Sequence, residues 1–257
     1  MKICRFTSRK NSLQRYGLVE DSSLRPLINP YPFEGEINPG DEILSLNEIK
    51  LLAPVQPSKI VCVGRNYMEH AAELGNALPE QPLLFLKAPS ALIGHEEAIK
   101  LPIESSQVEH EGELAVVIGR AASRLSDAED PMAFVFGYTC LNDVTARDLQ
   151  RKDVQFTRAK SFDTFCPVGP YIETELNPED LAVITRVNGQ IKQSASTYAM
   201  AFSVKFLIKY ISHAMTLFPG DLIATGTPAG VSKLHAGDIV EVEIEGIGVL
   251  KNPVLEV

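Results

Sequence analysis

Short apolar runs alternate with polar turns along most of the chain, and this pattern predicts a protein built mainly of β-strands. The runs are rich in β-branched residues and have the length of single strands. They cover residues 3–6, 16–19, 59–64, 114–118, 136–142 and 238–250, the last of which alternates like a pair of strands. Asn188-Gly189 separates residues 183–187 from 190–193, and Asn-Gly readily adopts the positive φ angles of a tight hairpin turn. We therefore expect a mixed, mostly β fold.

Three segments have the character of helices, and all of them are expected to lie at the periphery. Residues 203–215 place apolar side chains three or four positions apart, the spacing of an amphipathic helix. Residues 126–136 begin with a serine and acidic residues, which are favourable at a helix start. A third helix is expected to begin within residues 64–73, after a predicted strand. The order of elements contains no Rossmann-like series of strands and helices.

The N-terminal part of the chain differs from the rest. Two strand-like runs are followed by a stretch rich in Pro, Gly and Asn. Residues 51–57 contain two prolines, which remove backbone donors and fix φ, as in a linker. We interpret residues 1–56 as a small β-rich module and residues 57–257 as the main domain.

Composition and charge exclude several classes of protein. The chain of 257 residues has 24 Lys and Arg against 33 Asp and Glu, a formal net charge of −9, which argues against a nucleic-acid-binding surface. It has neither a secretory signal pattern nor an apolar segment long enough to span a membrane. The four cysteines are widely spaced, as expected for free thiols in the cytoplasm. We expect a cytoplasmic protein that acts on a small molecule.

An acidic motif runs directly into one of the predicted strands. The segment is VEHEGELAVV, residues 108–117. Because side chains alternate along a strand, Glu111 and Glu113 would lie on the same face. Two carboxylates this close repel each other unless a proton or a cation lies between them, and their oxygens suit Mg²⁺, Mn²⁺ or Ca²⁺. A solvated acidic strand edge is the alternative interpretation of this motif alone.

Other polar residues become informative only in combination. Asp143 follows an apolar run, and Lys160 lies between small and aromatic residues but by itself is typical of a surface lysine. His70 and Glu73 are three positions apart in a predicted helix, so they would share one face. In isolation such a pair is usually an exposed helix pair.

Taken together, these segments resemble the fumarylacetoacetate hydrolase family. The resemblance covers about residues 57–254 in collinear order and extends most closely to smaller bacterial and mitochondrial members, which act on acylpyruvates, oxaloacetate and hydroxymuconate-type diacids. The matching blocks are VGRNYMEHAAELG, PLLFLKAPSALIG, VEHEGELAVVIGR, GYTCLNDVTARDLQ, RAKSFDTFCPVGPYI and GDLIATGTPAGV. The resemblance implies the β-sandwich or roll of the family's C-terminal domain with peripheral helices. The N-terminal module is similar to a short extra segment that some members carry.

The resemblance implies a metal site. Members bind Mg²⁺ or Mn²⁺ through three carboxylates, which match Glu111, Glu113 and Asp143. Glu109 is a competing candidate, but the Glu-x-Glu immediately before Leu-Ala-Val-Val is the better match.

The resemblance also implies a catalytic and substrate-binding set. A substrate-contacting lysine matches Lys160, and a dyad on a mobile segment that closes over the substrate matches His70 and Glu73. The positions implied to bind substrate are Arg147, Gln150, Thr227 and Lys87.

The implied function is divalent-metal-dependent cleavage of a carbon–carbon bond in a small anionic 2-oxo acid. Acylpyruvate hydrolysis and oxaloacetate decarboxylation are the leading reactions, with His70 deprotonating water in hydrolysis and the metal stabilising an enolate. The alternatives are isomerisation of 2-hydroxyhepta-2,4-diene-1,7-dioate and the linked decarboxylation of 5-oxopent-3-ene-1,2,5-tricarboxylate. An inactive metal-binding scaffold and a calcium-stabilised structural domain are the non-enzymatic alternatives. The resemblance further implies a homodimer.

Overall fold

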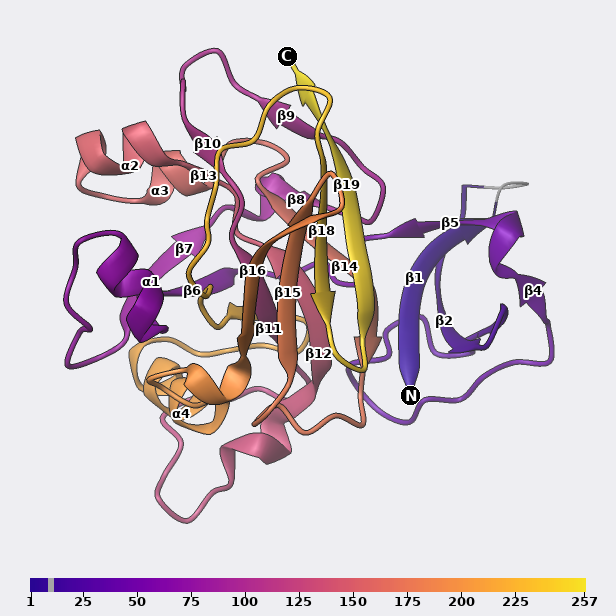
Figure 1. Cartoon of the computed structure of the whole chain (residues 1–257). Helices are drawn as coiled ribbons and strands as arrows, with labels where there is room; N and C mark the ends of the chain where they lie inside the picture. The colour runs from indigo at the N-terminus through magenta and orange to yellow at the C-terminus, as the bar shows by residue number, and fades with distance from the viewer. Residues whose placement is uncertain (9–11) are drawn as a thin grey trace.

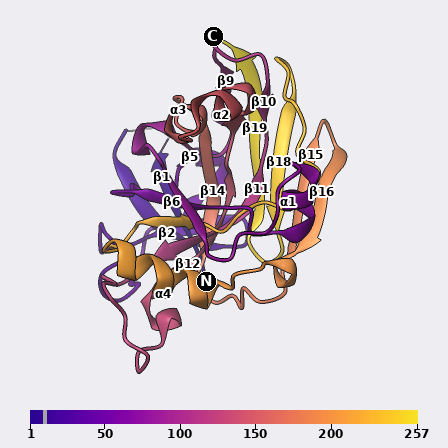
Figure 2. The same ribbon diagram turned by 90° about the vertical axis from the view of Figure 1, so that its left-hand side faces the viewer.

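The computed structural model describes residues 1–8 and 12–257 of the chain (Figure 1). Two β-sheets pack against each other, and the helices lie at their edges. Figure 2 shows the sheet of β15, β16, β18 and β19 on one side of the molecule and the larger sheet on the other. This arrangement confirms the predicted fold class, a mostly β sandwich with peripheral helices and a β-rich N-terminal part.

The larger sheet has twelve strands within the described residues. In spatial order its main path is β4 (Leu44–Ser45), β3 (Ser23–Pro26), β2 (Gln14–Glu20), β1 (Lys2–Ser8), β14 (Cys166–Glu173), β12 (Val135–Asn142), β11 (Gly112–Ile118), β17 (Leu222–Ala224), β6 (Ile60–Gly64) and β7 (Leu83–Lys87). Off this path, β5 (Ile49–Leu52) pairs with β1 and β8 (Leu92–Ile93) pairs with β14. Every residue of β11 is buried, so this strand lies at the centre of the molecule.

The second sheet is smaller and covers the centre of the first. In spatial order its strands are β16 (Gln190–Ser196), β15 (Ala182–Val187), β18 (Ile239–Ile244), β19 (Gly248–Glu256) and β9 (Ile99–Leu101). The turn between β15 and β16 has φ 52° at Asn188 and 76° at Gly189, which confirms the predicted hairpin. A separate two-stranded ladder pairs β10 (Val108–Glu109) with β13 (Thr145–Ala146).

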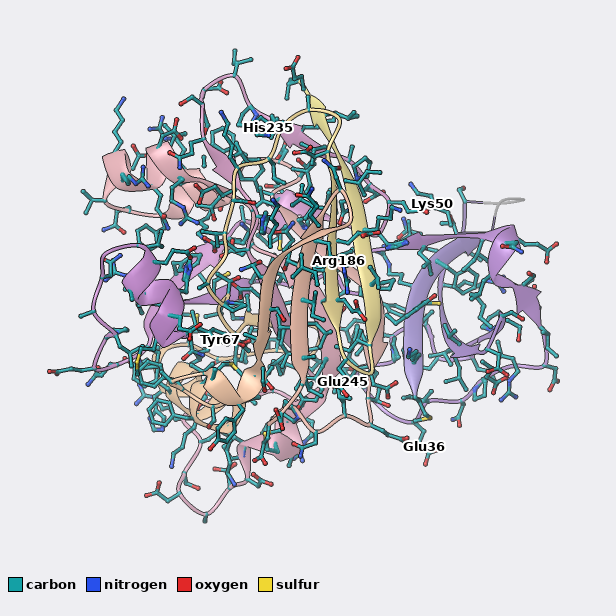
Figure 3. All side chains as sticks on the ribbon, in the orientation of Figure 1. Glu36, Lys50, Tyr67, Arg186, His235 and Glu245 are labelled. Atoms are coloured by element: carbon teal, nitrogen blue, oxygen red, sulfur yellow. The ribbon has the colours of Figure 1, made fainter. Side chains whose placement is uncertain are left out.

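Apolar side chains from both sheets form a shared core. Leu114 and Val116 of β11 are buried in one cluster with Val183 of β15 and Val242 of β18. Burial of each such side chain contributes about 1.5–3 kcal/mol, before the cost of ordering the chain is subtracted. Figure 3 shows the side chains on the ribbon in the orientation of Figure 1. The core therefore holds β11 rigidly between its neighbours and the second sheet.

The helices are short and lie at the edges. Their bounds are α1 (Met68–Glu73), α2 (Arg147–Asp153), α3 (Thr157–Lys160) and α4 (Val204–Ala214). Short 3₁₀ helices cover Leu46–Glu48, Pro89–Ala91, Pro131–Phe134 and Thr197–Ala199. The helix predicted for residues 203–215 is confirmed as α4, and Ser203 caps it by accepting a hydrogen bond from the Phe206 N–H.

The helix predicted for residues 126–136 is wrong. Glu129 accepts hydrogen bonds from the N–H and the hydroxyl of Ser126, so the segment begins as a turn. Asp130 then caps the 3₁₀ helix that begins at Pro131, and β12 begins at Val135. The local acidic pattern is that of a helix start, but pairing of the following residues with β11 draws them into the sheet.

The N-terminal strands continue the larger sheet. Strand β1 pairs with β2 and β5 and also with β14, where Lys2 lies opposite Glu173. The loop after β3 packs on the same sheet, because Phe33 meets the ring of Phe136 edge to face at 4.9 Å and the Tyr31 hydroxyl donates to the Pro219 carbonyl at 2.7 Å. A boundary between residues 56 and 57 therefore stays a prediction.

The cysteines match the expectation of unpaired buried thiols. All four are free and buried. Burial raises the pKa of Cys4, Cys140 and Cys166 to about 12, so these thiols stay protonated at neutral pH. Across residues 1–8 and 12–257, no helix combines the length and apolar character needed to span a membrane.

Candidate active site

Two neighbouring strands bring three acidic residues together. The β11–β12 ladder pairs Gly112 with Asn142, so Glu111, directly before β11, lies opposite Asp143, directly after β12. The Asp143 N–H donates to the Glu111 carbonyl at 2.8 Å, and Asn142 Oδ1 accepts from the Glu111 N–H at 2.9 Å. Glu113 follows two residues later on the same face. One oxygen from each of the three buried carboxylates lies within 4.8 Å of the other two.

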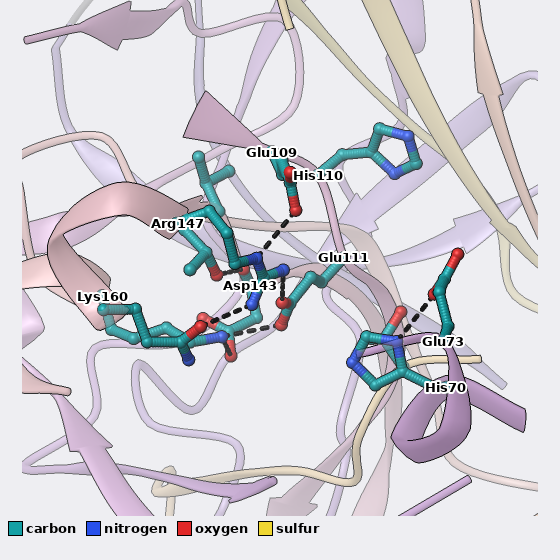
Figure 4. A network of polar contacts seen from close by, with 12 residues as sticks. His70, Glu73, Glu109, His110, Glu111, Asp143, Arg147 and Lys160 are labelled. Atoms are coloured by element: carbon teal, nitrogen blue, oxygen red, sulfur yellow. Dashed lines mark hydrogen bonds and ion pairs between the residues drawn. The ribbon is translucent and has the colours of Figure 1, made fainter. Parts of the chain in front are cut away.

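Lys160, at the end of α3, places its ammonium between two of these carboxylates. Its Nζ donates to Glu111 Oε2 and to Asp143 Oδ2, each at 2.7 Å (Figure 4). Burial disfavours the ammonium, but attraction to Asp143 and Glu111 outweighs burial and raises the pKa of Lys160 above its usual value. Lys160 is therefore a buried, charged residue of the site and not a surface lysine.

Arg147, at the start of α2, binds a second pair of carboxylates. Its Nε donates to Glu109 Oε2 at 2.7 Å, its Nη2 pairs with Glu111, and its Nη1 donates to Gln150 Oε1 at 2.6 Å. Glu109 thus lies against the guanidinium, outside the group of three carboxylates. Burial disfavours the Glu111 carboxylate, yet Lys160 and Arg147 hold its pKa well below the usual range.

Lys87, the last residue of β7, forms a hydrogen bond with one carboxylate of the cluster. Its Nζ donates to Asp143 Oδ1 at 2.6 Å and to the Val144 carbonyl at 3.1 Å, and the residue is only 1% exposed. Lys87 does not line the cavity described below. Its contacts therefore place it on Asp143, and a direct role in substrate binding stays a prediction.

Glu113 differs from its two neighbours because it lacks a basic partner. It accepts a hydrogen bond from the Gly226 N–H at 2.7 Å, and no cationic side chain in the described part of the chain contacts it. Burial and then the charges of Asp143 and Glu111 raise the pKa of Glu113 well above its usual value. A divalent cation would relieve this repulsion, and three buried carboxylates are hard oxygen ligands, so the residues fit Mg²⁺ or Mn²⁺.

His70 and Glu73 form a hydrogen-bonded pair on α1. His70 Nδ1 lies 3.2 Å from Glu73 Oε2, and Glu73 Oε1 accepts from the Gly230 N–H at 3.0 Å. An ionised carboxylate can only accept, so Nδ1 carries the proton and Nε2 keeps a free lone pair. Figure 4 shows the imidazole on the opposite side of Glu111 from Lys160.

A cavity of about 370 Å³ joins these residues. The residues of the predicted site that line it are His70, Glu73, Glu111, Glu113, Asp143, Arg147, Gln150, Lys160 and Thr227. Its wall also includes residues that sequence reasoning did not single out, among them Arg65, Arg151, Phe85 and Phe156. The cavity therefore combines a group of acidic ligands, basic side chains and an aromatic wall, which suits a small anionic ligand.

One polar residue behind the cavity was also missed. Gln193 is 1% exposed and bonds to both β11 and the loop that carries Thr227. Its only signal in the sequence is a polar residue at an inward position of a predicted hairpin strand, which many solvent-exposed hairpins also contain.

Comparison with known proteins identifies the family that this fold and site define. The family described as fumarylacetoacetate (FAA) hydrolase, C-terminal, matches residues 59–255, and the family described as Rv2993c-like, N-terminal, matches residues 1–54. The chain belongs to the fumarylacetoacetate hydrolase family.

Similar proteins include oxaloacetate tautomerase YisK from Bacillus subtilis. It is 47% identical over 235 residues, which cover 84% of this chain and 78% of the relative. A mitochondrial oxaloacetate tautomerase from Bos taurus is 44% identical over 226 residues, covering 83% and 72% of the two chains. Among solved structures, 2-hydroxyhepta-2,4-diene-1,7-dioate isomerase from Mycobacterium marinum has a TM-score of 0.90 and 44% identity, covering 100% of this chain and 98% of that chain.

Proposed function

We propose that the protein is a divalent-metal-dependent enzyme that interconverts the keto and enol forms of a small anionic 2-oxo acid, with oxaloacetate as the substrate. The observation that carries this proposal is the position of His70. Its ring lines the same cavity as Lys160 and the three carboxylates, and its free Nε2 is available as a base. The family resemblance implies bond cleavage first, but tautomerisation needs only a proton transfer, and a histidine base beside the carboxylates supports that simpler reaction. The names of two relatives support the same reaction.

The charges of the site suit a dianionic substrate. Glu111, Glu113 and Asp143 would hold the cation, which supplies positive charge beside the 2-oxo and carboxylate oxygens of the substrate when it is bound. Lys160 and Arg147 add two permanent cations at the same cavity. With the cation present, the neighbourhood is positive although the whole chain is acidic.

The dyad would carry the proton. In the keto-to-enol direction, His70 Nε2 takes a proton from the carbon next to the 2-oxo group, and the electron pair moves to the 2-oxo oxygen. Water then gives that oxygen the proton that completes the enol, and the imidazolium returns its proton to the solvent. Glu73, fixed by the Gly230 N–H, stabilises the imidazolium through Nδ1. Lys160 stabilises the negative charge that develops on the oxygen. General base catalysis of this kind typically contributes about 10²–10⁴-fold in rate.

The test is turnover of enol-oxaloacetate, followed by ultraviolet absorbance with Mg²⁺ or Mn²⁺. We expect the wild-type protein to accelerate the loss of the enol, and His70→Ala to lower kcat by about 10²-fold or more. Oxalate binding to His70→Ala should stay close to wild type, because the carboxylates, Lys160 and Arg147 are unchanged. Wild-type protein that binds oxalate but leaves the tautomerisation rate at the background value would contradict the proposal and favour the inactive scaffold.

Cleavage of an acylpyruvate is the second candidate function. It is supported by the similarity to the solved structure of fumarylacetoacetate hydrolase from Exiguobacterium antarcticum, with a TM-score of 0.89 and 39% identity over 100% of both chains. In this reaction His70 would deprotonate water instead of carbon. Acetylpyruvate in the same assay separates the two candidates, since faster turnover of acetylpyruvate than of enol-oxaloacetate would reverse their order.

A further inference from the structure

Gln193 of β16 is a buried amide that forms hydrogen bonds with residues next to the candidate site. Its Oε1 accepts from the Gly112 N–H at 3.0 Å and lies 3.2 Å from His110 Nδ1. Its Nε2 donates to Thr227 Oγ1 and to the Pro228 carbonyl, each at 2.7 Å. One side chain of the smaller sheet thus joins β11, at the residue between the two glutamate ligands, to the loop that carries Thr227.

The partners of Gln193 determine which way its amide points. The Gly112 N–H can only donate, and the Pro228 carbonyl can only accept, so Oε1 must face the former and Nε2 the latter. His110 Nδ1 then donates to Oε1, and His110 Nε2 accepts from the Ser232 hydroxyl at 2.8 Å. Every hydrogen-bonding group of the Gln193 side chain therefore has a partner.

This arrangement also determines the direction of the Thr227 hydroxyl. Thr227 Oγ1 lies 2.9 Å from the Gly112 carbonyl, which only accepts, so the hydroxyl proton points there. The same oxygen accepts from Gln193 Nε2. What Thr227 Oγ1 can still offer a ligand in the cavity is one lone pair, and it has no proton left to donate.

The surrounding backbone leaves little room for another arrangement. A Cβ on Gly230, which has φ +103°, would lie 2.0 Å from the Lys192 carbonyl oxygen, so the Thr227 loop rests directly on β16. A Cβ on Gly112 would lie 3.4 Å from Gln193 Oε1. The Thr227 loop, β16 and Gly112 are therefore closely packed around the Gln193 amide.

We propose that Gln193 is a positioning residue that fixes the Thr227 hydroxyl as a hydrogen-bond acceptor towards the cavity. The inference rests on the proposed function, because the enol form of a 2-oxo acid carries the O–H that such an acceptor binds. A ligand made only of acceptors, such as oxalate, gains nothing from this lone pair. Gln193 thus favours ligands with a hydroxyl on the carbon next to the carboxylate.

The test compares two small ligands of the Mn²⁺-loaded protein by calorimetry. Glycolate has a hydroxyl donor at that carbon, whereas oxalate has only acceptors. Gln193→Met removes the donor that holds Thr227 Oγ1 beside the Gly112 carbonyl, so the Thr227 side chain can turn away from that carbonyl and lose its fixed acceptor position. Glycolate should then lose about five- to tenfold in affinity relative to oxalate. Thr227→Val, which removes the acceptor itself, should shift the ratio in the same direction. Adding Gln193→Met to Thr227→Val should then change it by less than about twofold.

The matched control is Asn252→Leu. Asn252 is an equally buried amide of the same sheet, but it donates to the carbonyls of Gly94 and Glu97, and none of these three residues lines the cavity. Its variant should lower the melting temperature and leave the glycolate-to-oxalate ratio unchanged. An unchanged ratio in folded Gln193→Met, or the same shift in Asn252→Leu, would overturn the proposal.

A second variant of Gln193 and a readout based on binding keep the proposal falsifiable. Where Gln193→Met does not fold, Gln193→Asn retains an amide that is too short to bridge Gly112 and Thr227, and the same shift in ratio is expected. Because the readout is binding, it is independent of turnover. A shifted ratio in a protein that does not tautomerise oxaloacetate would refute the proposed function while supporting the role of Gln193.

Discussion

At the residue scale, Lys160 already occupies two of the carboxylates that would hold a divalent cation. The ammonium donates to Glu111 and Asp143, which are two of the three candidate metal ligands. Glu113 has no cationic partner among the described residues, and its raised pKa means that the cluster favours an added proton or cation. The lysine would thus partly neutralise the carboxylates before a cation binds and would repel the cation once it is bound.

This arrangement predicts that Lys160→Met binds Mn²⁺ more tightly than the wild-type protein. Removing a buried cation that occupies ligand oxygens should lower the Kd by about tenfold, while turnover falls because charge stabilisation is lost. Titration calorimetry measures the affinity. Arg158→Met is the matched control, because it removes the same charge from the same helix α3 at an exposed pair with Asp153. Weaker Mn²⁺ binding by Lys160→Met would show that the lysine helps to hold the ligands in place.

At the element scale, the site depends on how closely β11 approaches the smaller sheet. Gly112, between the two glutamates, faces Thr185 of β15, and a Cβ there would lie 2.0 Å from Thr185 Oγ1. Only a residue without a side chain allows this contact. The same close approach lets Gln193 reach the Gly112 N–H.

We therefore expect Gly112→Ala to damage both stability and metal binding. Overpacking of this kind costs about 1–3 kcal/mol, and the displaced strand should weaken Mn²⁺ binding through Glu111 and Glu113. Thr185→Ala should restore much of the loss, because the buried Thr185 hydroxyl has no hydrogen-bond partner within the described residues. Thr185→Ala alone is the control and should stay within about 1 kcal/mol of wild type by chemical denaturation. The prediction fails if the double variant is no more stable than Gly112→Ala.

At the scale of the whole molecule, the N-terminal strands share one sheet with the strands that carry the candidate site. Strand β1 covers the edge of β14, and Phe33 packs against Phe136. Removing the N-terminal strands would expose both a strand edge and apolar surface. The homodimer implied by the family resemblance stays a prediction at this scale, and light scattering of the purified protein tests it.

Deletion of residues 1–54 should therefore destabilise the remainder. We expect residues 55–257 to melt at a lower temperature than the full chain and to aggregate through the exposed β14 edge. Differential scanning calorimetry and light scattering measure the two effects. Tyr31→Phe, which removes only the hydrogen bond to Pro219, is the mild control. A monodisperse fragment with the melting temperature of the full chain would show that the N-terminal module is an independent unit.

Metal binding should stabilise the whole fold. At a concentration one hundred times Kd, a ligand of the native state adds about 2.7 kcal/mol, which for a chain of this size raises Tm by about 5–10 °C. Glu113→Gln should raise Tm without metal, because folding raises the pKa of the Glu113 carboxyl and such a group costs stability at neutral pH. The same variant should abolish most of the rise with Mg²⁺ or Mn²⁺. Chelation with EDTA should reverse the wild-type rise. A rise seen with Ca²⁺ alone would favour the calcium-stabilised structural domain.

The sequence by itself determined the local features of this protein. Alternation identified the strands and placed Glu111 and Glu113 on one face, helical spacing paired His70 with Glu73, and Asn188-Gly189 identified the hairpin. Each of these follows from backbone geometry over a few residues, so a short window of sequence contains all the information needed. Helical signals in residues 126–136 failed because strand pairing outweighed them.

Only the tertiary structure decided which charges meet. Lys160 is 49 residues from Glu111, and Gln193 is 81 residues from Gly112, so no local pattern connects them. The tertiary structure also pairs Glu109 with Arg147. It pairs Lys87 with Asp143, and Lys87 does not line the cavity. Such contacts depend on sheet order and on the close packing of two layers, and both arise from the chain as a whole. The types of chemical group in the site could thus be predicted, whereas their partners depend on the fold.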